Sequence, residues 1–82
     1  MPTSIQQPSL ADLITGQQGV IQDCLAQGTL KLKLLNMGFI PGTKVTMIRN
    51  APLRDPIEIS IQNYLLTLRR SEAKLIMVKY HG

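Results

Sequence analysis

The residues that could carry out catalysis or bind a metal ion are few and far apart in this chain. It has one cysteine, Cys24, and one histidine, His81, among its 82 residues. A metal site built from such side chains needs three or four ligands close together, and a catalytic nucleophile needs a base within hydrogen-bond reach. Asp55 and Glu58 could touch a hard cation, but two carboxylates are too few for a dedicated cage. The sequence therefore predicts no catalytic residue, no cofactor and no metal site.

Two glycine-containing stretches can be compared with phosphate-binding loops. A P-loop ends in Gly-Lys-Ser/Thr and opens a helix. Gly42-Thr43-Lys44 has these residue types in another order and precedes a strand-like stretch, and the stretch from Gly16 to Gly19 also leads toward a strand. Because such loops bind phosphate with the backbone amides of a helix N-terminus, we do not expect nucleotide binding.

The composition indicates one small domain with an aliphatic core. Hydrophobic residues make up 44% of the chain, but only Phe39, Tyr64 and Tyr80 are aromatic. Nine Lys and Arg against five Asp and Glu give a net charge of +4, scattered along the chain. The charge leaves open a nucleic-acid surface, although aromatic stacking platforms are not interleaved with the basic residues. The residues for that alternative are Lys31, Lys33, Arg69 and Arg70.

The sequence gives no sign of secretion or membrane insertion. A lone cysteine cannot form an intramolecular disulfide, which fits a reducing compartment. Neither a basic n-region nor an apolar h-region occurs in the opening stretch MPTSIQQPSLADL. No apolar run approaches the roughly 20 residues of a membrane span. We therefore expect a cytoplasmic protein.

The hydrophobic pattern predicts a mainly β domain. Residues 1–9, with two prolines, are expected to form a flexible arm, and residues 10–82 the single domain. Strands are expected over residues 20–25, 44–50, 57–61, 64–68 and 75–80, with short helical turns after Ser9 and from Ser71. The stretch from Thr15 to Gly19 is expected to break the chain. Five short strands favour a small barrel, because closure removes exposed sheet edges.

The stretch from Leu30 to Leu34 is ambiguous, because leucine and lysine alternate there as in a strand. Leu30 and Leu34 also lie on one helical face with Met37, and no β-branched residue occurs between Leu30 and Met37. Thr29 can cap the start of a helix and Gly38 its end. We therefore predict one α-helix near Thr29–Met37, in which Leu32 points away from the apolar face.

The glycines and prolines between these elements are interpreted as turn residues. Pro41-Gly42 is expected to form a type II turn. Gln62-Asn63 is expected to link two strands, since Asn63 tolerates a positive φ. Ala51 to Pro56 is expected to form a second turn. The predicted turn residues are Gly38, Pro41, Gly42, Pro52, Asp55, Pro56 and Asn63.

Three stretches follow one another from Leu30 onward: LKLKLLNMGFIPGTKV, NAPLRDPIEI and YLLTLRRSEAKLIMV. Taken in this order, they closely resemble motifs of the FeoA family, the small cytoplasmic component of bacterial ferrous iron uptake. Family members show Leu-Gly-hydrophobic-x-Pro-Gly, Ala-Pro-Leu-Gly-Asp-Pro and Leu-Arg-x-x-Glu-Ala, which correspond to residues 37–42, 51–56 and 68–73. The resemblance covers about residues 9–79. Arg54 replaces the glycine of the second motif, so the turn avoids a positive φ there or Arg54 is strained.

The resemblance implies an SH3-like β-barrel and a partner, FeoB, a membrane transporter with a cytoplasmic GTPase domain. It also implies a non-enzymatic accessory or regulatory role in ferrous iron uptake, at the inner membrane through that partner and without membrane insertion of its own. Two alternatives stay open. One is a regulatory module that binds Fe(II) or Mn(II) weakly, and the other is a basic barrel that binds nucleic acid.

A partner surface is expected around two leucines that lie beside basic residues. Leu32 lies on the polar side of the predicted helix, and Leu53 lies in a turn between Pro52 and Arg54. Exposed apolar side chains of this kind can bind another chain, and self-association through them is also possible. The predicted partner-binding residues are Leu32, Met37, Phe39, Leu53, Arg54 and Tyr64.

Overall fold

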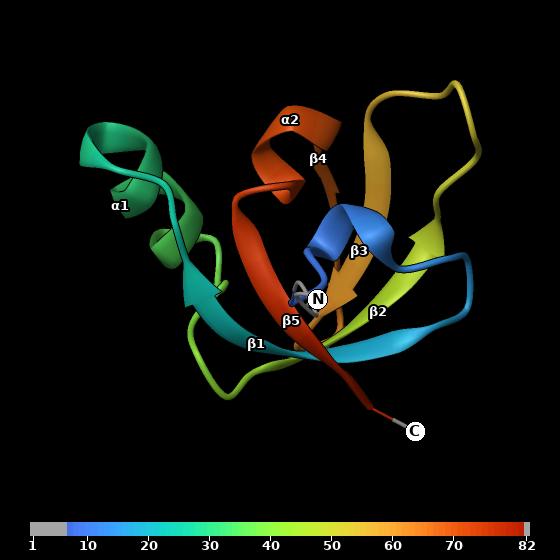
Figure 1. The fold of residues 1–82 in the computed structure, drawn as a ribbon, viewed down its shortest axis with the longest axis horizontal. Coiled ribbons are helices and arrows are strands. Elements are labelled where there is room, and N and C mark those ends of the chain that lie inside the picture. Colours follow the sequence, from blue (N-terminus) through green and yellow to red (C-terminus); the bar gives the residue numbers. More distant parts are fainter. Residues whose placement is uncertain (1–6, 82) are drawn as a thin grey trace, which may run out of the picture.

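The computed structural model describes residues 7–81, which fold around a five-stranded antiparallel sheet (Figure 1). The strands are β1 (Gln18–Cys24), β2 (Lys44–Arg49), β3 (Ile57–Ile61), β4 (Tyr64–Leu68) and β5 (Ile76–His81). The helical elements are the 3-10 turn η1 (Leu10–Asp12), α1 (Gly28–Asn36) and α2 (Arg70–Ala73). These elements confirm the predicted mainly β fold of five strands, one longer helix and short helical turns.

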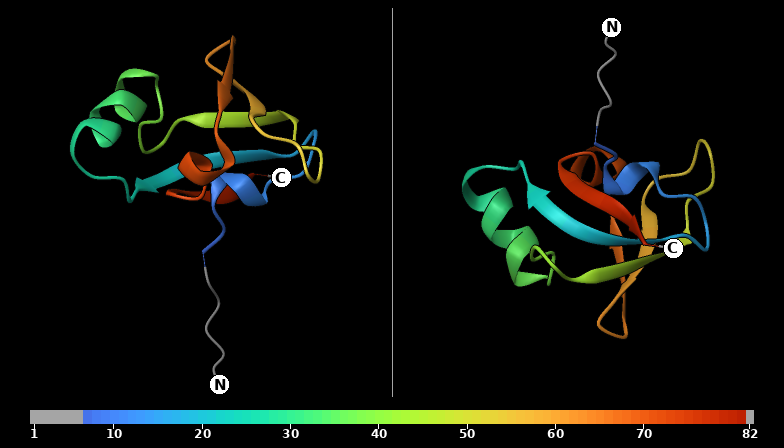
Figure 2. Two further views of the ribbon diagram at one scale, coloured as in Figure 1. Left: turned by 90° about the horizontal axis from the view of Figure 1, so that it is seen from above. Right: turned by 60° about the horizontal axis from the view of Figure 1, so that its bottom comes forward.

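The sheet curls strongly, and its two edge strands come to lie on either side of the core (Figures 1 and 2). The strand order is β4-β3-β2-β1-β5, so β4 and β5 form the edges. The short helix α2 leads from β4 to β5 and thereby joins the two edges. Helix α1 lies beyond the end of β1, at one end of the molecule (Figure 2).

The outer edge of β5 is covered by the chain that precedes η1. The backbone N–H of Val78 donates to the carbonyl of Pro8 at 2.9 Å, and Ser9 forms a β-bridge with Met77. Pro8 and Ser9 are therefore part of the folded domain, and including them in a flexible arm was wrong. Of the rest of the predicted arm, Gln7 is exposed, and residues 1–6 lie outside the described residues.

Period-two alternation places one face of β2 and one face of β3 in an aliphatic core. Val45 and Met47 on β2 are buried, as are Ile57, Ile59 and Ile61 on β3. Cys24 is buried as well, as a small side chain of the core. The one aromatic side chain in the core of residues 7–81 is that of Phe39. Burial of alternate residues on these strands is what the sequence pattern predicted.

Helix α1 ends as predicted but begins earlier. Gly38 has a φ of 110°, and its N–H donates to the carbonyl of Leu35 at 3.0 Å, while the N–H of Phe39 donates to that of Leu34 at 3.1 Å. These two bonds form a Schellman motif, which satisfies carbonyls that the helix end leaves free. Thr29 lies inside the helix, so its prediction as the N-cap was wrong.

Replacing Gly38 with alanine is expected to lower the free energy of unfolding by about 1–2 kcal/mol, because a Cβ is unfavourable at this φ. Space is not the cause, since an added Cβ would lie 3.6 Å from the Ile61 Cδ1 atom, an ordinary contact. Urea unfolding of the variant would measure the loss. The control is Asn36→Ala, at an exposed helical position nearby, which should not lower stability. Equal stability of Gly38→Ala and wild type would contradict the motif.

Two predicted turns are confirmed in detail. The N–H of Thr43 donates to the carbonyl of Ile40 at 3.0 Å, and Gly42 has a φ of 94°, as a type II turn requires. In the β3–β4 hairpin, Gln62 and Asn63 have φ values of 50° and 69°. Two successive positive φ values are typical of a type I′ turn, whose twist matches that of the strands.

Other element boundaries also differ from the prediction. β1 begins at Gln18, so Gly19 lies within the strand and not in a break. A Cβ on Gly19 would lie 3.3 Å from the carbonyl oxygen of Lys79, so glycine allows β5 to approach closely here. Helix α2 begins at Arg70 and not at Ser71. Arg69 is the residue just before the helix, and its N–H donates to the Glu72 carboxylate at 3.1 Å. β5 runs one residue later than expected.

Candidate partner-binding surface

The six predicted partner-binding residues do not form one surface. Leu32 on α1 and Leu53 in the loop between β2 and β3 lie at opposite ends of the molecule (Figures 1 and 2). Both are exposed, and so is Tyr64 at the start of β4. Met37 is partly buried against the core, and Phe39 is fully buried. Phe39 follows the Schellman glycine, a position that typically packs back onto the helix, so its prediction as a surface contact was wrong.

The β2–β3 loop carries the most exposed large hydrophobic side chain of residues 7–81, that of Leu53, at 107% relative exposure. The N–H of Arg54 donates to the carbonyl of Ala51 at 3.1 Å, which closes a turn with Pro52 and Leu53 at its centre. Leu53 has a φ of 69°. A type II turn requires such a φ at this position, where glycine is favoured. The strain anticipated for Arg54 therefore falls on Leu53.

The side chain of Arg70 holds this loop in place. Its guanidinium donates to the Oδ1 atom of Asn50 at 2.7 Å and to the carbonyl of Ala51 at 3.0 Å. It also donates to the carbonyl of Arg54 at 2.6 Å. The backbone N–H of Arg70 donates to the Asp55 carboxylate at 2.8 Å. Arg70 therefore fixes both ends of the turn, and the start of α2 is anchored to the loop.

Asn50 extends this network toward the N-terminal part of the domain. Its Nδ2 atom donates to the carbonyls of Ala11 at 3.1 Å and Leu13 at 2.6 Å. Its backbone N–H donates to the Thr15 hydroxyl at 3.0 Å. The Asn50 amide thus accepts from Arg70 on one side and donates to two carbonyls on the other. The base of the β2–β3 loop is consequently connected to η1 and to the segment between η1 and β1.

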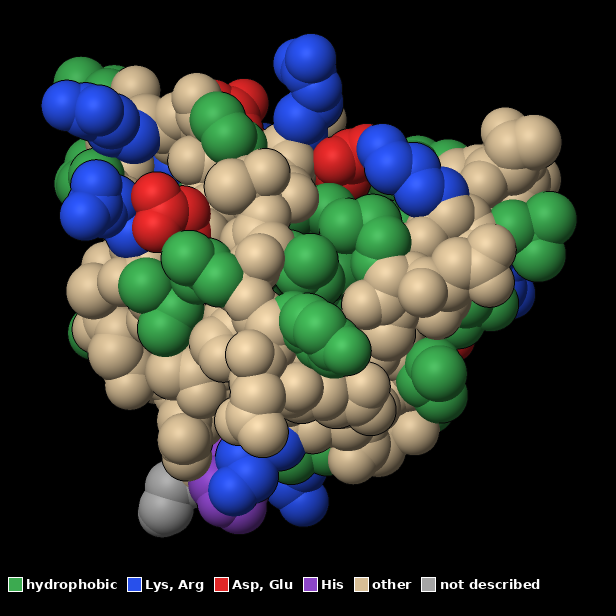
Figure 3. Space-filling model, turned by 180° about the vertical axis from the view of Figure 1, so that it is seen from behind, with side chains coloured by type: hydrophobic (Ala, Val, Ile, Leu, Met, Phe, Trp, Pro, Cys, Tyr) green, Lys and Arg blue, Asp and Glu red, His purple; other side chains and the backbone are tan. Residues whose placement is uncertain are grey.

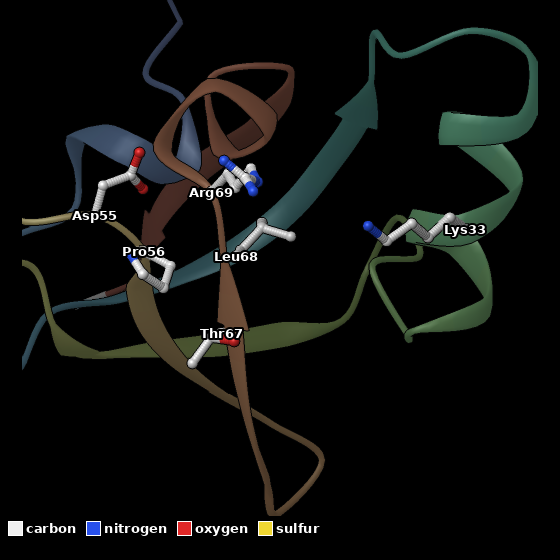
Figure 4. A pocket seen from close by; sticks show the side chains of 6 residues that line it. All are labelled: Lys33, Asp55, Pro56, Thr67, Leu68 and Arg69. Carbon is white, nitrogen blue, oxygen red and sulfur yellow. The ribbon is translucent and has the colours of Figure 1, made fainter.

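A groove of about 420 Å³ lies between α1 and β4, next to the end of the β2–β3 loop (Figure 4). Figure 4 shows the side chains of Lys33 and Arg69 on either side of its opening, with Leu68 between them. The Lys33 amino group also pairs with the Glu72 carboxylate at 3.4 Å. The groove is lined by Lys33, Asp55, Pro56, Thr67, Leu68 and Arg69.

The four basic residues considered for nucleic-acid binding do not form a free cationic surface. Arg70 donates to oxygens of its own chain, and Lys33 pairs with Glu72. Lys31 and Arg69 are exposed, on α1 and just before α2. A nucleic-acid surface gains most of its affinity from several cations that face phosphates together. The arrangement of these side chains therefore does not favour that alternative.

Within residues 7–81, no three His, Cys, Asp or Glu side chains are grouped so that they could hold a metal ion. Asp55, one of the two carboxylates that could touch a cation, accepts a hydrogen bond from the backbone of Arg70. In the same part of the chain, no helix is both long and apolar enough to cross a membrane.

Residues 9–80 match the family model described as the FeoA domain. A relative from Porphyromonas gingivalis, an Fe(2+) transport protein A/Fe(2+) transporter FeoB fusion protein, is 40% identical over 70 residues. The match covers 85% of this chain and 8% of the relative. The chain thus spans less than a tenth of the length of this much larger protein.

Solved structures show the same fold. Iron(II) transport protein A from Clostridium thermocellum has a TM-score of 0.85 and 40% identity, over 92% of this chain and 46% of that one. FeoA from Stenotrophomonas maltophilia, a procaryotic SH3 domain protein crystallised with zinc, has a TM-score of 0.75 and 28% identity, over 88% and 89% of the two chains. These similarities confirm the predicted SH3-like fold. Since the family model covers nearly the whole sequence, the chain belongs to the FeoA family.

Proposed function

We propose that this chain is a non-enzymatic accessory protein of ferrous iron uptake that acts by binding a FeoB-type transporter, including its GTPase domain. The observation that carries the proposal is the Porphyromonas gingivalis relative, in which a 40% identical segment is joined to an Fe(2+) transporter. Joining two modules in one chain raises the effective concentration of each at the other. Such an arrangement is useful where the two modules also interact.

The surface of the domain supports a role in protein binding. Several large hydrophobic side chains are exposed, among them Leu53 on the β2–β3 loop and Tyr64 and Leu65 on β4. The guanidinium of Arg70 donates hydrogen bonds to two carbonyls of the loop, and a groove lies beside it. A rigid exposed surface with apolar contacts is what recognition of another chain requires. The protein would then be cytoplasmic and would reach the inner membrane through its partner.

Deletion of this protein is expected to lower uptake of radioactive Fe(II) in iron-limited cells, and expression of the chain in trans should restore it. The tagged chain is also expected to co-purify with the full-length transporter from detergent-solubilised membranes, with and without guanine nucleotide. Unchanged uptake together with failure to co-purify would reject the proposal. Both effects are expected because this chain can change the activity of the transporter only while it is bound to it.

The two alternatives give different results in accompanying measurements. A metal-responsive module would release or absorb heat on titration with Fe(II) or Mn(II) in an anaerobic calorimeter. A nucleic-acid-binding barrel would bind RNA or DNA at low salt and lose affinity as the salt concentration rises. Under the proposed function, neither titration shows binding that accounts for the effect on uptake.

A further inference from the structure

We infer that Leu53 is the anchor by which this chain docks into an apolar pocket on its transporter partner, and that the acidic rim of that pocket faces Arg54. The identity of the partner rests on the proposed function. The assignment of Leu53 as the contact residue rests on the exposure, backbone conformation, hydrogen bonding and charge of the β2–β3 loop.

The first observation is that Leu53 projects entirely into solvent. Its relative exposure is 107%, against 61% for Leu32 on α1 and 68% for Tyr64 on β4. A leucine side chain that moves from water into an apolar pocket strengthens an association roughly tenfold to a hundredfold. Leu53 offers this gain in full, because no part of its surface is already covered by its own domain.

The second observation is the backbone conformation of Leu53. Its φ of 69° belongs to the left-handed region, where glycine is favoured. Glycine would meet this turn's requirement without strain, yet the chain has a leucine there. A strained residue that contributes nothing to the core suggests a use outside the fold. The side chain, rather than the backbone, is then the reason for leucine at this position.

The third observation is that hydrogen bonds from the loop's own domain hold it without any partner. The guanidinium of Arg70 donates to the carbonyls of Ala51 and Arg54, the residues on either side of the Pro52-Leu53 tip. Pro52 adds its own restriction on φ. Docking of a rigid loop costs less conformational entropy than docking of a loop that has to be ordered, so more of the contact energy appears as affinity.

The charges around the loop indicate the chemistry of the pocket. Arg54 is exposed, and so is Arg49 at the end of β2, whereas the Asp55 carboxylate is engaged by the backbone of Arg70. In Figure 3, Lys and Arg side chains lie beside hydrophobic ones at the corner of the molecule that holds the β2–β3 loop, and acidic side chains lie next to them. Glu58 is the register partner of Arg49, so Arg54 is the cation at the tip of the loop. Acidic side chains around the pocket would complement this surface. A second copy of the chain would bring the same cations close together, which is unfavourable. The partner that we propose for this loop is therefore the transporter.

The test compares affinity with stability in the same variants. Leu53→Gly is expected to weaken binding to the full-length transporter in detergent by at least about tenfold. The midpoint of its thermal unfolding should be no lower than that of wild type, because glycine accepts this φ. The matched control is Leu25→Gly, at an exposed leucine after β1, which should leave the affinity unchanged. Leu53→Met should retain most of the affinity.

The acidic rim has its own test. Leu53→Asp should weaken binding more than Leu53→Lys, because only the aspartate would face like charges in the complex. Neither substitution should unfold the barrel, since Leu53 is fully exposed. A larger loss for the lysine variant would overturn the acidic rim.

The outcomes separate this inference from the proposed function. If wild type binds the transporter and Leu53→Gly binds equally well, the anchor is rejected while the proposed function stands. If Leu53→Gly lowers the unfolding midpoint together with the affinity, Leu53 serves the fold and the inference is also rejected. If wild type does not bind the transporter, both fail. If Leu53→Gly instead abolishes self-association seen by analytical ultracentrifugation, the occupant is a second copy and the transporter pocket is rejected.

Discussion

Replacing Arg70 with methionine is expected to lower the free energy of unfolding by about 2–3 kcal/mol, because three hydrogen bonds from a charged group are lost together. The guanidinium now donates to Asn50, Ala51 and Arg54. For a domain of this size, such a loss corresponds to a fall in Tm of roughly 10–20 °C. Thermal unfolding followed by circular dichroism would measure it.

The neighbouring arginine provides a matched control. Arg69 is exposed, and its hydrogen bond to Glu72 comes from the backbone N–H, which Arg69→Met retains. We expect this variant to lie within about 0.5 kcal/mol of wild type. Arg70→Lys should not restore stability, because a lysine cannot reach several acceptors with one planar group. Equal effects of the Arg69 and Arg70 substitutions would show that the loop does not depend on Arg70.

Arg70→Met should also lower the affinity for the transporter, through its effect on the β2–β3 loop and not through a contact of Arg70 with the partner. If the loop is rigid because of Arg70, then its loss should broaden or shift the NMR signals of Ala51 to Asp55 at temperatures where the barrel stays folded. Transporter affinity should fall in step, since a mobile loop loses conformational entropy on docking. A fully folded Arg70→Met variant with unchanged loop signals would contradict this description of the loop.

Replacing Phe39 with alanine is expected to lower the free energy of unfolding by about 3–5 kcal/mol, the usual cost of removing a buried aromatic ring. Phe39 is fully buried and belongs to the same core cluster as Leu34, so the deletion leaves a cavity beside the end of α1. Small domains have only about 5–15 kcal/mol of stability in total. The variant should therefore lose a large part of its stability and unfold at a much lower urea concentration than wild type, as urea titration of the purified variant would show.

Tyr64→Ala is the aromatic control for this prediction. Tyr64 is 68% exposed, so its replacement should change stability only slightly. Phe39→Leu should lose less stability than Phe39→Ala, because much of the buried volume is retained. A Phe39→Ala variant that stays as stable as wild type but no longer binds the transporter would mean that Phe39 is a contact residue after all.

The elements of the fold could be predicted where a local pattern determines them. The alternation from Ile57 to Ile61 places apolar side chains on one face, and Gly38 gives the end of α1 its positive φ. Gly19 was misread as a chain break, because glycine also occurs where two strands approach closely. That approach depends on β5, which lies some sixty residues further along the chain (Gly19 pairs with Tyr80).

The candidate site was only partly visible in the sequence. The exposure of Leu53 could be predicted because prolines and polar residues bound its turn. Arg70 could not be distinguished from Arg69, because its acceptors lie 16 to 20 residues away in the sequence and are backbone carbonyls or an amide. The expected patch of Leu32 and Leu53 failed for the same reason. Local exposure was correct for both, but the fold places them at opposite ends of the molecule.

The bridge between Ser9 and Met77 has a consequence for the association of one copy of this chain with another. An uncovered strand edge presents free N–H and C=O groups to any passing strand, including that of another copy. Pro8 accepts the hydrogen bond that Val78 would otherwise offer to such a strand, and proline has no N–H of its own to offer in return. The residues just before η1 thus occupy this part of the β5 edge and hinder the addition of a strand from another copy of the chain.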